Sequence, residues 1–234
     1  MFIDRLYITD LGLGVYGVLY VPVLLLGLAV FYRKVLSSVW LAGLRWGVLL
    51  LVAALTLSLP LWDVLSISIE ARRLCQEQGG LRVHRTAETA GFIGDSDIEF
   101  WSKHGFSYVE SGGGSQMSRY TIQDGKTKHE RVSEFLSRYE LRSMENHVAI
   151  GKHFARTKQA VVDRQTGLAL GELVYFVIYP GLWDGTLLRM MQAGPSLWNC
   201  GNEPPPGHEV LRLGGSDIVL ATLKPRKTFE EETK

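Results

Sequence analysis

The two cysteines, Cys75 and Cys200, are the residues with the clearest chemistry in this sequence. One follows shortly after two long apolar stretches, and the other lies near the far end of the polar region. This placement predicts a single structural disulfide that closes a long loop in an oxidising compartment. The alternative is a pair of unrelated buried thiols in a reducing compartment. Because neither a C-x-x-C motif nor a Cys-His metal spacing occurs, we expect no redox or zinc site.

The histidines and glycines form no known catalytic or ligand-binding pattern. His147 and His153 are six residues apart and Glu145 lies near them, but no third metal ligand has a conventional spacing. The motifs G-x-S-x-G and H-E-x-x-H are absent, and the glycines at 112–114 lack the Gly-Lys-Ser or Gly-Lys-Thr of a phosphate loop. We therefore expect no catalytic residue, metal or cofactor. Ser, His and Asp side chains that converge only in space are the alternative.

Trp183 and Asp184 are the candidate contacts for a protein partner. They follow Pro180-Gly181 and read as an exposed turn, where an aromatic side chain often binds a partner. The alternative is a tryptophan that packs over the edge of the core. Over Gly181–Trp198 the sequence also shows helical spacing, in Trp183, Leu187, Leu188, Met190 and Met191, and the Met pair is expected to fill the core.

Two stretches, Leu11–Tyr32 and Trp46–Trp62, contain no Asp, Glu, Lys or Arg. A helix needs about 20 apolar residues to cross a hydrocarbon core of roughly 30 Å. The sequence therefore predicts a transmembrane hairpin over residues 1–66, with helices at about 11–32 and 38–65. A secretory signal peptide and a buried core helix are weaker alternatives, since the apolar core is long and the first residues offer only Arg5 as a basic residue.

Aromatic and basic residues flank the two apolar stretches where bilayer interfaces are expected. The predicted interface residues are Tyr32, Arg33, Lys34, Trp40, Arg45, Trp46 and Trp62. Arg33 and Lys34 lie in the short connecting segment, directly against a helix end. Basic residues in short loops favour the cytoplasmic side, so we expect both termini on the opposite side of the membrane.

Residues 67–227 are expected to form one extracytoplasmic α+β domain, mainly an antiparallel β-sheet with one or two helices, followed by a disordered tail at 228–234. The chain has 25 Lys and Arg against 24 Asp and Glu, so no strong field would attract nucleic acid. Helices are expected at 70–78 and 95–104, and a turn at Asp163–Gly167. The expected strands are Leu81–His84, Phe106–Val109, Tyr120–Ile122, Phe135–Ser143, His153–Val162, Leu168–Tyr179 and Asp217–Leu223.

By elimination, the sequence favours a non-enzymatic accessory or assembly protein of the bacterial envelope. We expect a multi-pass protein of the inner membrane with a periplasmic domain, whose partners are the lipid bilayer and another membrane or envelope protein. Three alternatives stay open: an envelope immunity or exclusion factor, an extracytoplasmic ligand- or lipid-binding sensor module, and a membrane-bound enzyme without a recognisable motif.

Overall fold

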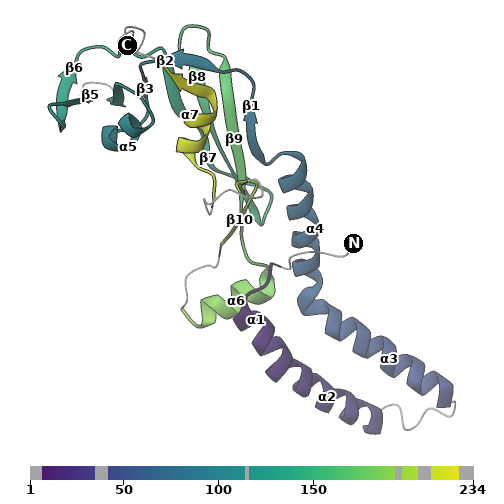
Figure 1. Cartoon of the computed structure of the whole chain (residues 1–234). Coiled ribbons are helices and arrows are strands. Elements are labelled where there is room, and N and C mark those ends of the chain that lie inside the picture. Colours follow the sequence, from purple (N-terminus) through teal and green to yellow (C-terminus); the bar gives the residue numbers. More distant parts are fainter. Residues whose placement is uncertain (1–6, 35–41, 114–115, 193–196, 205–211, 227–234) are drawn as a thin grey trace. The chain divides into compact units, whose positions relative to one another are not determined.

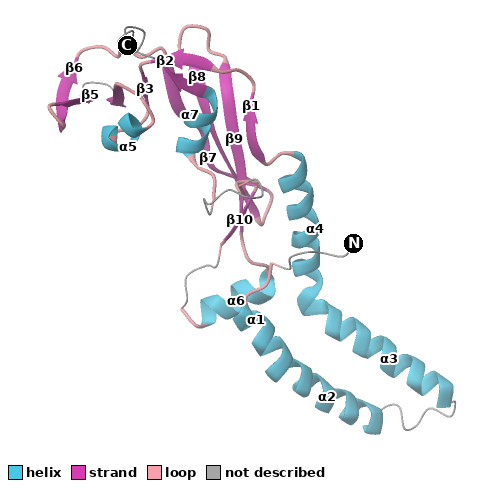
Figure 2. Ribbon diagram, in the orientation of Figure 1, coloured by secondary structure: helices cyan, strands magenta, loops and turns pink. Residues whose placement is uncertain are grey.

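The computed structural model describes residues 7–34, 42–113, 116–192, 197–204 and 212–226, and these are α+β (Figures 1 and 2). The chain divides into two compact units. We call Met1–Leu74, Ile150–Phe154 and Val177–Trp198 the helical unit, and Cys75–Ala149, Ala155–Phe176 and Asn199–Lys234 the sheet unit. The helical unit thus combines the apolar helices with two later segments of the chain. The expected tail at 228–234 lies outside the described residues.

Two long apolar helices begin the helical unit. The first runs through α1 (Asp10–Val15), a π-helical segment (Tyr16–Tyr20) and α2 (Val21–Lys34). The π segment ends two residues before Pro22, which has no N–H to donate to the helix. The second runs through α3 (Ala42–Ser58), a 3₁₀ turn (Leu59–Leu61) that contains Pro60, and α4 (Trp62–Glu77). Both helices are long and apolar enough to cross a membrane.

Side chains of the first helix tie it to the second. The Tyr16 hydroxyl donates to the Leu57 carbonyl at 2.9 Å, and the Tyr20 hydroxyl donates to the Thr56 carbonyl at 2.7 Å. Further along, the rings of Tyr32 and Trp46 lie 5.8 Å apart. The two helices therefore pair along their length as an antiparallel hairpin.

The strands form one large mixed sheet and a small parallel pair. Their bounds are β1 (Gly80–Val83), β2 (Ala87–Thr89), β3 (Gly91–Ile93), β4 (Tyr108–Gly113), β5 (Gln116–Gln123), β6 (Lys126–Val132), β7 (Tyr139–Ile150), β8 (Phe154–Asp163), β9 (Ala169–Ile178), β10 (Trp198–Cys200) and β11 (Leu223–Pro225). The large sheet has the order β1-β9-β8-β7-β3-β4-β5-β6, with β10 beside β9. Every strand expected between residues 81 and 179 overlaps one of these.

Two strands of the sheet unit pair in ways that local sequence patterns did not predict. β3 pairs in parallel with both β4 and β7, and β11 pairs in parallel with β2. The predicted turn between β8 and β9 is confirmed: the Asp163 N–H donates to the Leu168 carbonyl, and Gly167 adopts a positive φ of 73°. The sheet is thus mainly antiparallel but mixed.

One hydrophobic core lies within the sheet unit. Strand residues such as Phe92 and Leu173 pack there with Trp101 of α5 (Ile98–Lys103) and with Ile218 and Val219 of α7 (Gly215–Thr222). The expected helix at 95–104 is confirmed as the shorter α5, which Asp97 caps by accepting from the Phe100 N–H at 3.0 Å.

The expected strand at Asp217–Leu223 is wrong, because most of this segment is helix α7. The Asp217 carboxylate accepts a hydrogen bond from the Gly214 N–H at 2.7 Å and so closes the first turn. Ile218, Val219 and Thr222 then lie buried along one helix face. Burial of that face outweighs the strand preference of its β-branched residues.

A fully buried glutamate, Glu110, links β4 to its neighbours. Its carboxylate accepts from Arg119 Nε at 2.9 Å and from the backbone N–H groups of Leu136 and Ser137 at 3.2 and 2.9 Å. Burial raises the pKa of Glu110, but the hydrogen bonds from Ser137, Arg119 and Leu136 outweigh burial and hold the pKa below the usual 4.5. Glu110 is therefore a charged structural residue of the sheet unit.

Candidate functional site

The segment around Trp183 is helix α6 (Leu182–Met190), so the expected exposed turn is wrong. Its first N–H, that of Leu182, donates to the carboxylate of Asp63 at the start of α4. An acidic group at the first turn satisfies a donor that the helix cannot pair and interacts well with the helix dipole. Asp63 therefore fixes the beginning of α6 from a distant part of the sequence.

Asp184 is fully buried and fixes the first turn of α6 to the start of α1. Its carboxylate accepts from the Thr9 N–H at 2.6 Å and from the Thr9 hydroxyl at 2.8 Å. The Thr9 hydroxyl in turn accepts from the Gly12 N–H at 2.9 Å and caps α1. Asp184 therefore has its described contacts inside the chain, while its expected role as a partner contact stays untested.

Trp183 packs on the first apolar helix. Its Nε1–H donates to the Gly12 carbonyl at 3.0 Å, and its ring meets the edges of Tyr16 and Tyr20 at centroid distances of 6.4 and 5.6 Å. Figure 1 shows α6 beside the N-terminal end of α1. The alternative of a tryptophan that covers a packed edge therefore describes Trp183 better than an exposed turn.

Gly12 makes this close packing possible. A Cβ atom at Gly12 would overlap the Asp184 carboxylate, whereas a Cβ at Gly14, in the same helix, would meet nothing within 4 Å. A glycine is thus needed at position 12 because the Asp184 side chain of α6 leaves no space for a Cβ atom, and not because of the backbone conformation of Gly12.

We expect Gly12→Ala to loosen α6, because the added methyl group must displace Asp184 from the Thr9 hydrogen bonds. Overpacking of this kind costs about 1–3 kcal/mol, so amide hydrogen exchange in α6 should quicken by roughly ten- to a hundredfold. Gly14→Ala is the matched control and should leave α6 exchange unchanged. Equal exchange in both variants would contradict the packing described for Gly12.

An apolar groove of about 420 Å³ lies between α6 and the start of α4. It is lined by Leu59, Pro60, Trp62, Asp63, Leu182, Trp183 and Thr186. Leu182 and Trp62 also expose most of their side chains beside it. Met190 and Met191, which were expected to fill the core, are instead exposed at the end of α6.

The structure separates the predicted interface residues into two groups. Tyr32 and Trp46 contact each other where the hairpin connects, with Arg33 and Lys34 at the end of α2 and Arg45 early in α3. Trp62 is the first residue of α4, at the far end of the uncharged part of the second helix and beside the groove. Trp40 lies outside the described residues.

Thr9 and Asp63 are site residues that local sequence patterns did not predict. Thr9-Asp10 before an apolar helix does carry a local signal, since Thr is a common N-cap. Nothing local shows that Asp184 would bind Thr9 across 175 positions of sequence. Such a contact is visible only once the chain is folded.

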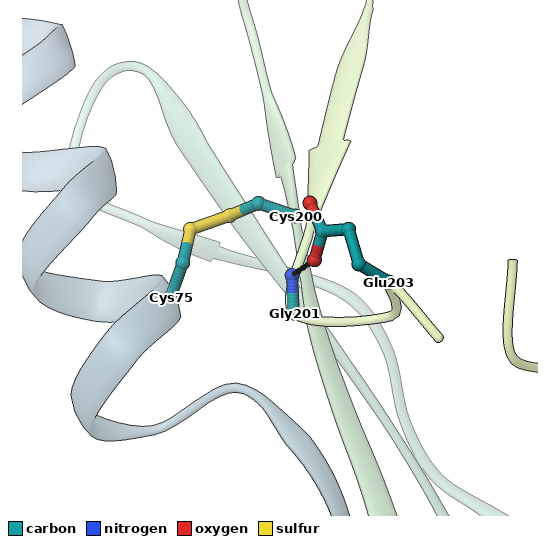
Figure 3. The surroundings of a disulfide bond; sticks show 4 residues. All are labelled: Cys75, Cys200, Gly201 and Glu203. Carbon is teal, nitrogen blue, oxygen red and sulfur yellow. Dashed lines mark hydrogen bonds between the residues drawn. A yellow bond between two sulfur atoms is a disulfide. The ribbon is translucent and has the colours of Figure 1, made fainter. Parts of the chain in front are cut away.

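In the sheet unit, the structure pairs Cys75 with Cys200 as the predicted disulfide, with a Cα–Cα distance of 5.8 Å (Figure 3). Next to it the Gly201 N–H donates to the Glu203 carboxylate at 2.7 Å. A Cβ at Gly79 would lie 2.8 Å from the Gly201 Cα, so the backbone after α4 passes close to the backbone after Cys200. The bond therefore fixes the end of α4 within the sheet unit.

Among the described residues, no group of three or more His, Cys, Asp or Glu side chains could hold a metal ion. Glu145 forms a two-point ion pair with Arg156, at 2.6 and 2.8 Å. His147 contacts the Asn146 side chain, and His153 contacts the Pro180 carbonyl. Each of these three residues thus has a local partner.

Comparison of the chain with protein-family models, curated proteins and solved structures finds no match.

Proposed function

We propose that the two long apolar helices form a transmembrane hairpin, and that the chain is a non-enzymatic accessory or assembly protein that presents its sheet unit at the membrane surface. The observation that carries this proposal is the outward direction of the apolar side chains. Of the most apolar window in each helix, 0% and 6% is buried inside the protein. Uncovered apolar surface of this extent is costly in water and favourable in lipid.

We further place the chain in the bacterial inner membrane, with the sheet unit in the periplasm. Arg33 and Lys34 at the connecting end of the hairpin favour a cytoplasmic position for that end. The Cys75–Cys200 bond is suited to an oxidising compartment, which favours the periplasm for the sheet unit. Charge and disulfide chemistry thus support the same orientation.

A binding role is favoured over catalysis by the way the buried carboxylates are used. Glu110, Asp163 and Asp184 each accept hydrogen bonds from other groups of the chain. In particular, the guanidinium of Arg138 holds the pKa of Asp163 far below its usual range. Glu110 and Asp163, whose pKa values are lowered by internal donors, serve structure better than proton transfer near neutral pH.

Thiol labelling tests the orientation. Intact cells that make the full chain are treated with a membrane-impermeant maleimide, with and without prior reduction, and the same is done after the membranes are opened. We expect labelling of intact cells only after reduction, and none in a Cys75→Ser, Cys200→Ser control. Labelling that needs opened membranes and no reductant would place the sheet unit in the cytoplasm and contradict the proposal.

Cross-linking in intact cells tests the accessory role. We expect the 26.2 kDa chain to appear in one discrete larger complex with another envelope protein after the membrane is dissolved in detergent. A chain that stays monomeric under the same treatment would contradict an assembly or accessory function.

A further inference from the structure

We propose that α6 is a third membrane element, which lies in the interfacial layer of the bilayer with one face against lipid. This inference rests on the proposed transmembrane hairpin. It goes beyond the hairpin because α6 is separate in sequence and was predicted to be a turn or core segment.

The hydrogen bonds of α6 place it at the boundary of the apolar helices. Asp10 and Asp63 are the charged residues that limit the uncharged parts of the two helices on this side of the hairpin. α6 is held at both limits: Asp63 accepts its first N–H, and Asp184 binds Thr9, the residue before Asp10. Both contacts are made by the first turn of α6, so this turn lies at the level where hydrocarbon gives way to headgroups.

The exposed face of α6 has the composition of an interfacial helix. Leu182, Thr186 and Met190 recur every fourth residue and form one stripe, in which Leu182 is 63% and Met190 76% exposed. Arg189 is exposed beside the stripe and is positioned for anionic headgroups. The acidic residue of the helix, Asp184, faces inward and is fully buried.

The groove makes this face continuous with the hairpin surface. Leu59 and Trp62, which are 69% and 71% exposed, line it from the second helix, and Leu182 lines it from α6. The apolar surface therefore runs from the second helix onto α6, and the half-buried Asp63 between them accepts the Leu182 N–H. In the proposed hairpin, lipid acyl chains cover the second helix, so acyl chains are also the occupant that fits the groove beside it. Trp62 at the groove agrees with this, because tryptophan is enriched at the interface between hydrocarbon and headgroups.

Site-specific photo-cross-linking in native membranes tests the inference. A diazirine amino acid is placed at one position of the full chain, and lipid adducts are measured by mass spectrometry. Met190 is the test position. Leu26, exposed in α2, reports lipid contact of the hairpin. Arg73, ten residues beyond Asp63 and thus about 15 Å further along α4, is the aqueous control.

We expect the lipid-adduct yield at Met190 to be at least half that at Leu26 and at least tenfold that at Arg73. A high yield at Leu26 with a Met190 yield equal to that at Arg73 would overturn the interfacial helix and leave the hairpin standing. Background yield at both Leu26 and Met190 would overturn the hairpin and, with it, this inference.

Discussion

Replacing Glu110 by Gln is expected to lower the free energy of unfolding of the sheet unit by about 3 kcal/mol, because it leaves the Arg119 guanidinium without its charged partner in a largely buried position. Gln has the same shape, so the loss reports charge and hydrogen bonding, not a cavity. Native-state hydrogen exchange of the β4 and β5 amides, on the full chain in detergent, measures the change without a contribution from the apolar helices.

Glu140→Gln is the matched control. Its ion pair with Arg142 is exposed, so its loss should cost no more than about 0.5 kcal/mol. The pH dependence is a second check: the folded pKa of Glu110 lies below 4.5, so its contribution is present above that pH and is lost as the pH falls further. The difference between wild type and Glu110→Gln should therefore shrink below pH 4.5. A difference that stays constant with pH would contradict the charged role of Glu110.

Removal of the disulfide is expected to have an effect at least as large. Joint replacement of Cys75 and Cys200 by Ser should lower the free energy of unfolding of the sheet unit by about 3–5 kcal/mol, since the bond spans 125 positions of sequence and restricts the unfolded chain. Thermal or denaturant unfolding of the full chain in detergent measures the loss.

Reductant supplies the control for this prediction. It should destabilise the wild type to the level of the double Ser variant and leave that variant unchanged. Equal stability of the wild type with and without reductant would mean that the bond does not hold the sheet unit together.

Local patterns predicted the elements whose signals are carried by neighbouring residues. The turn at Asp163–Gly167 needs only an Asp that bonds its own backbone and a Gly with positive φ, so the hairpin of β8 and β9 was predictable. The end of α4 at Glu77 was predictable because the glycines at 79 and 80 follow it, and glycine commonly ends a helix. Strand pairing in parallel, as in β3 with β4 and β7, has no such local signal.

Two predictions of local structure were wrong because contacts with distant residues determined the structure of these segments. The 217–223 segment has strand-forming residues, yet Asp217 caps a helix and the core buries one face of it. Residues 183–185 were predicted to be a turn, although apolar residues recur at helical spacing after Gly181; they form the first turn of α6, where Asp63 pairs the first N–H and Thr9 binds Asp184. In both cases tertiary partners outweighed preferences worth less than about 1 kcal/mol per residue.

The two apolar helices, the turn-bounded strands and the chemistry of the cysteine pair could be predicted from the amino-acid order, because periodicity, length and residue type act over short distances along the chain. Tertiary structure alone decided which residues meet: Thr9 with Asp184, Gly12 with Trp183, and Glu110 with Arg119 and Ser137. Buried polar groups need hydrogen-bond partners, and those partners are the groups that the fold brings near them. Because these partners can be far away in the sequence, local patterns do not predict the pairs.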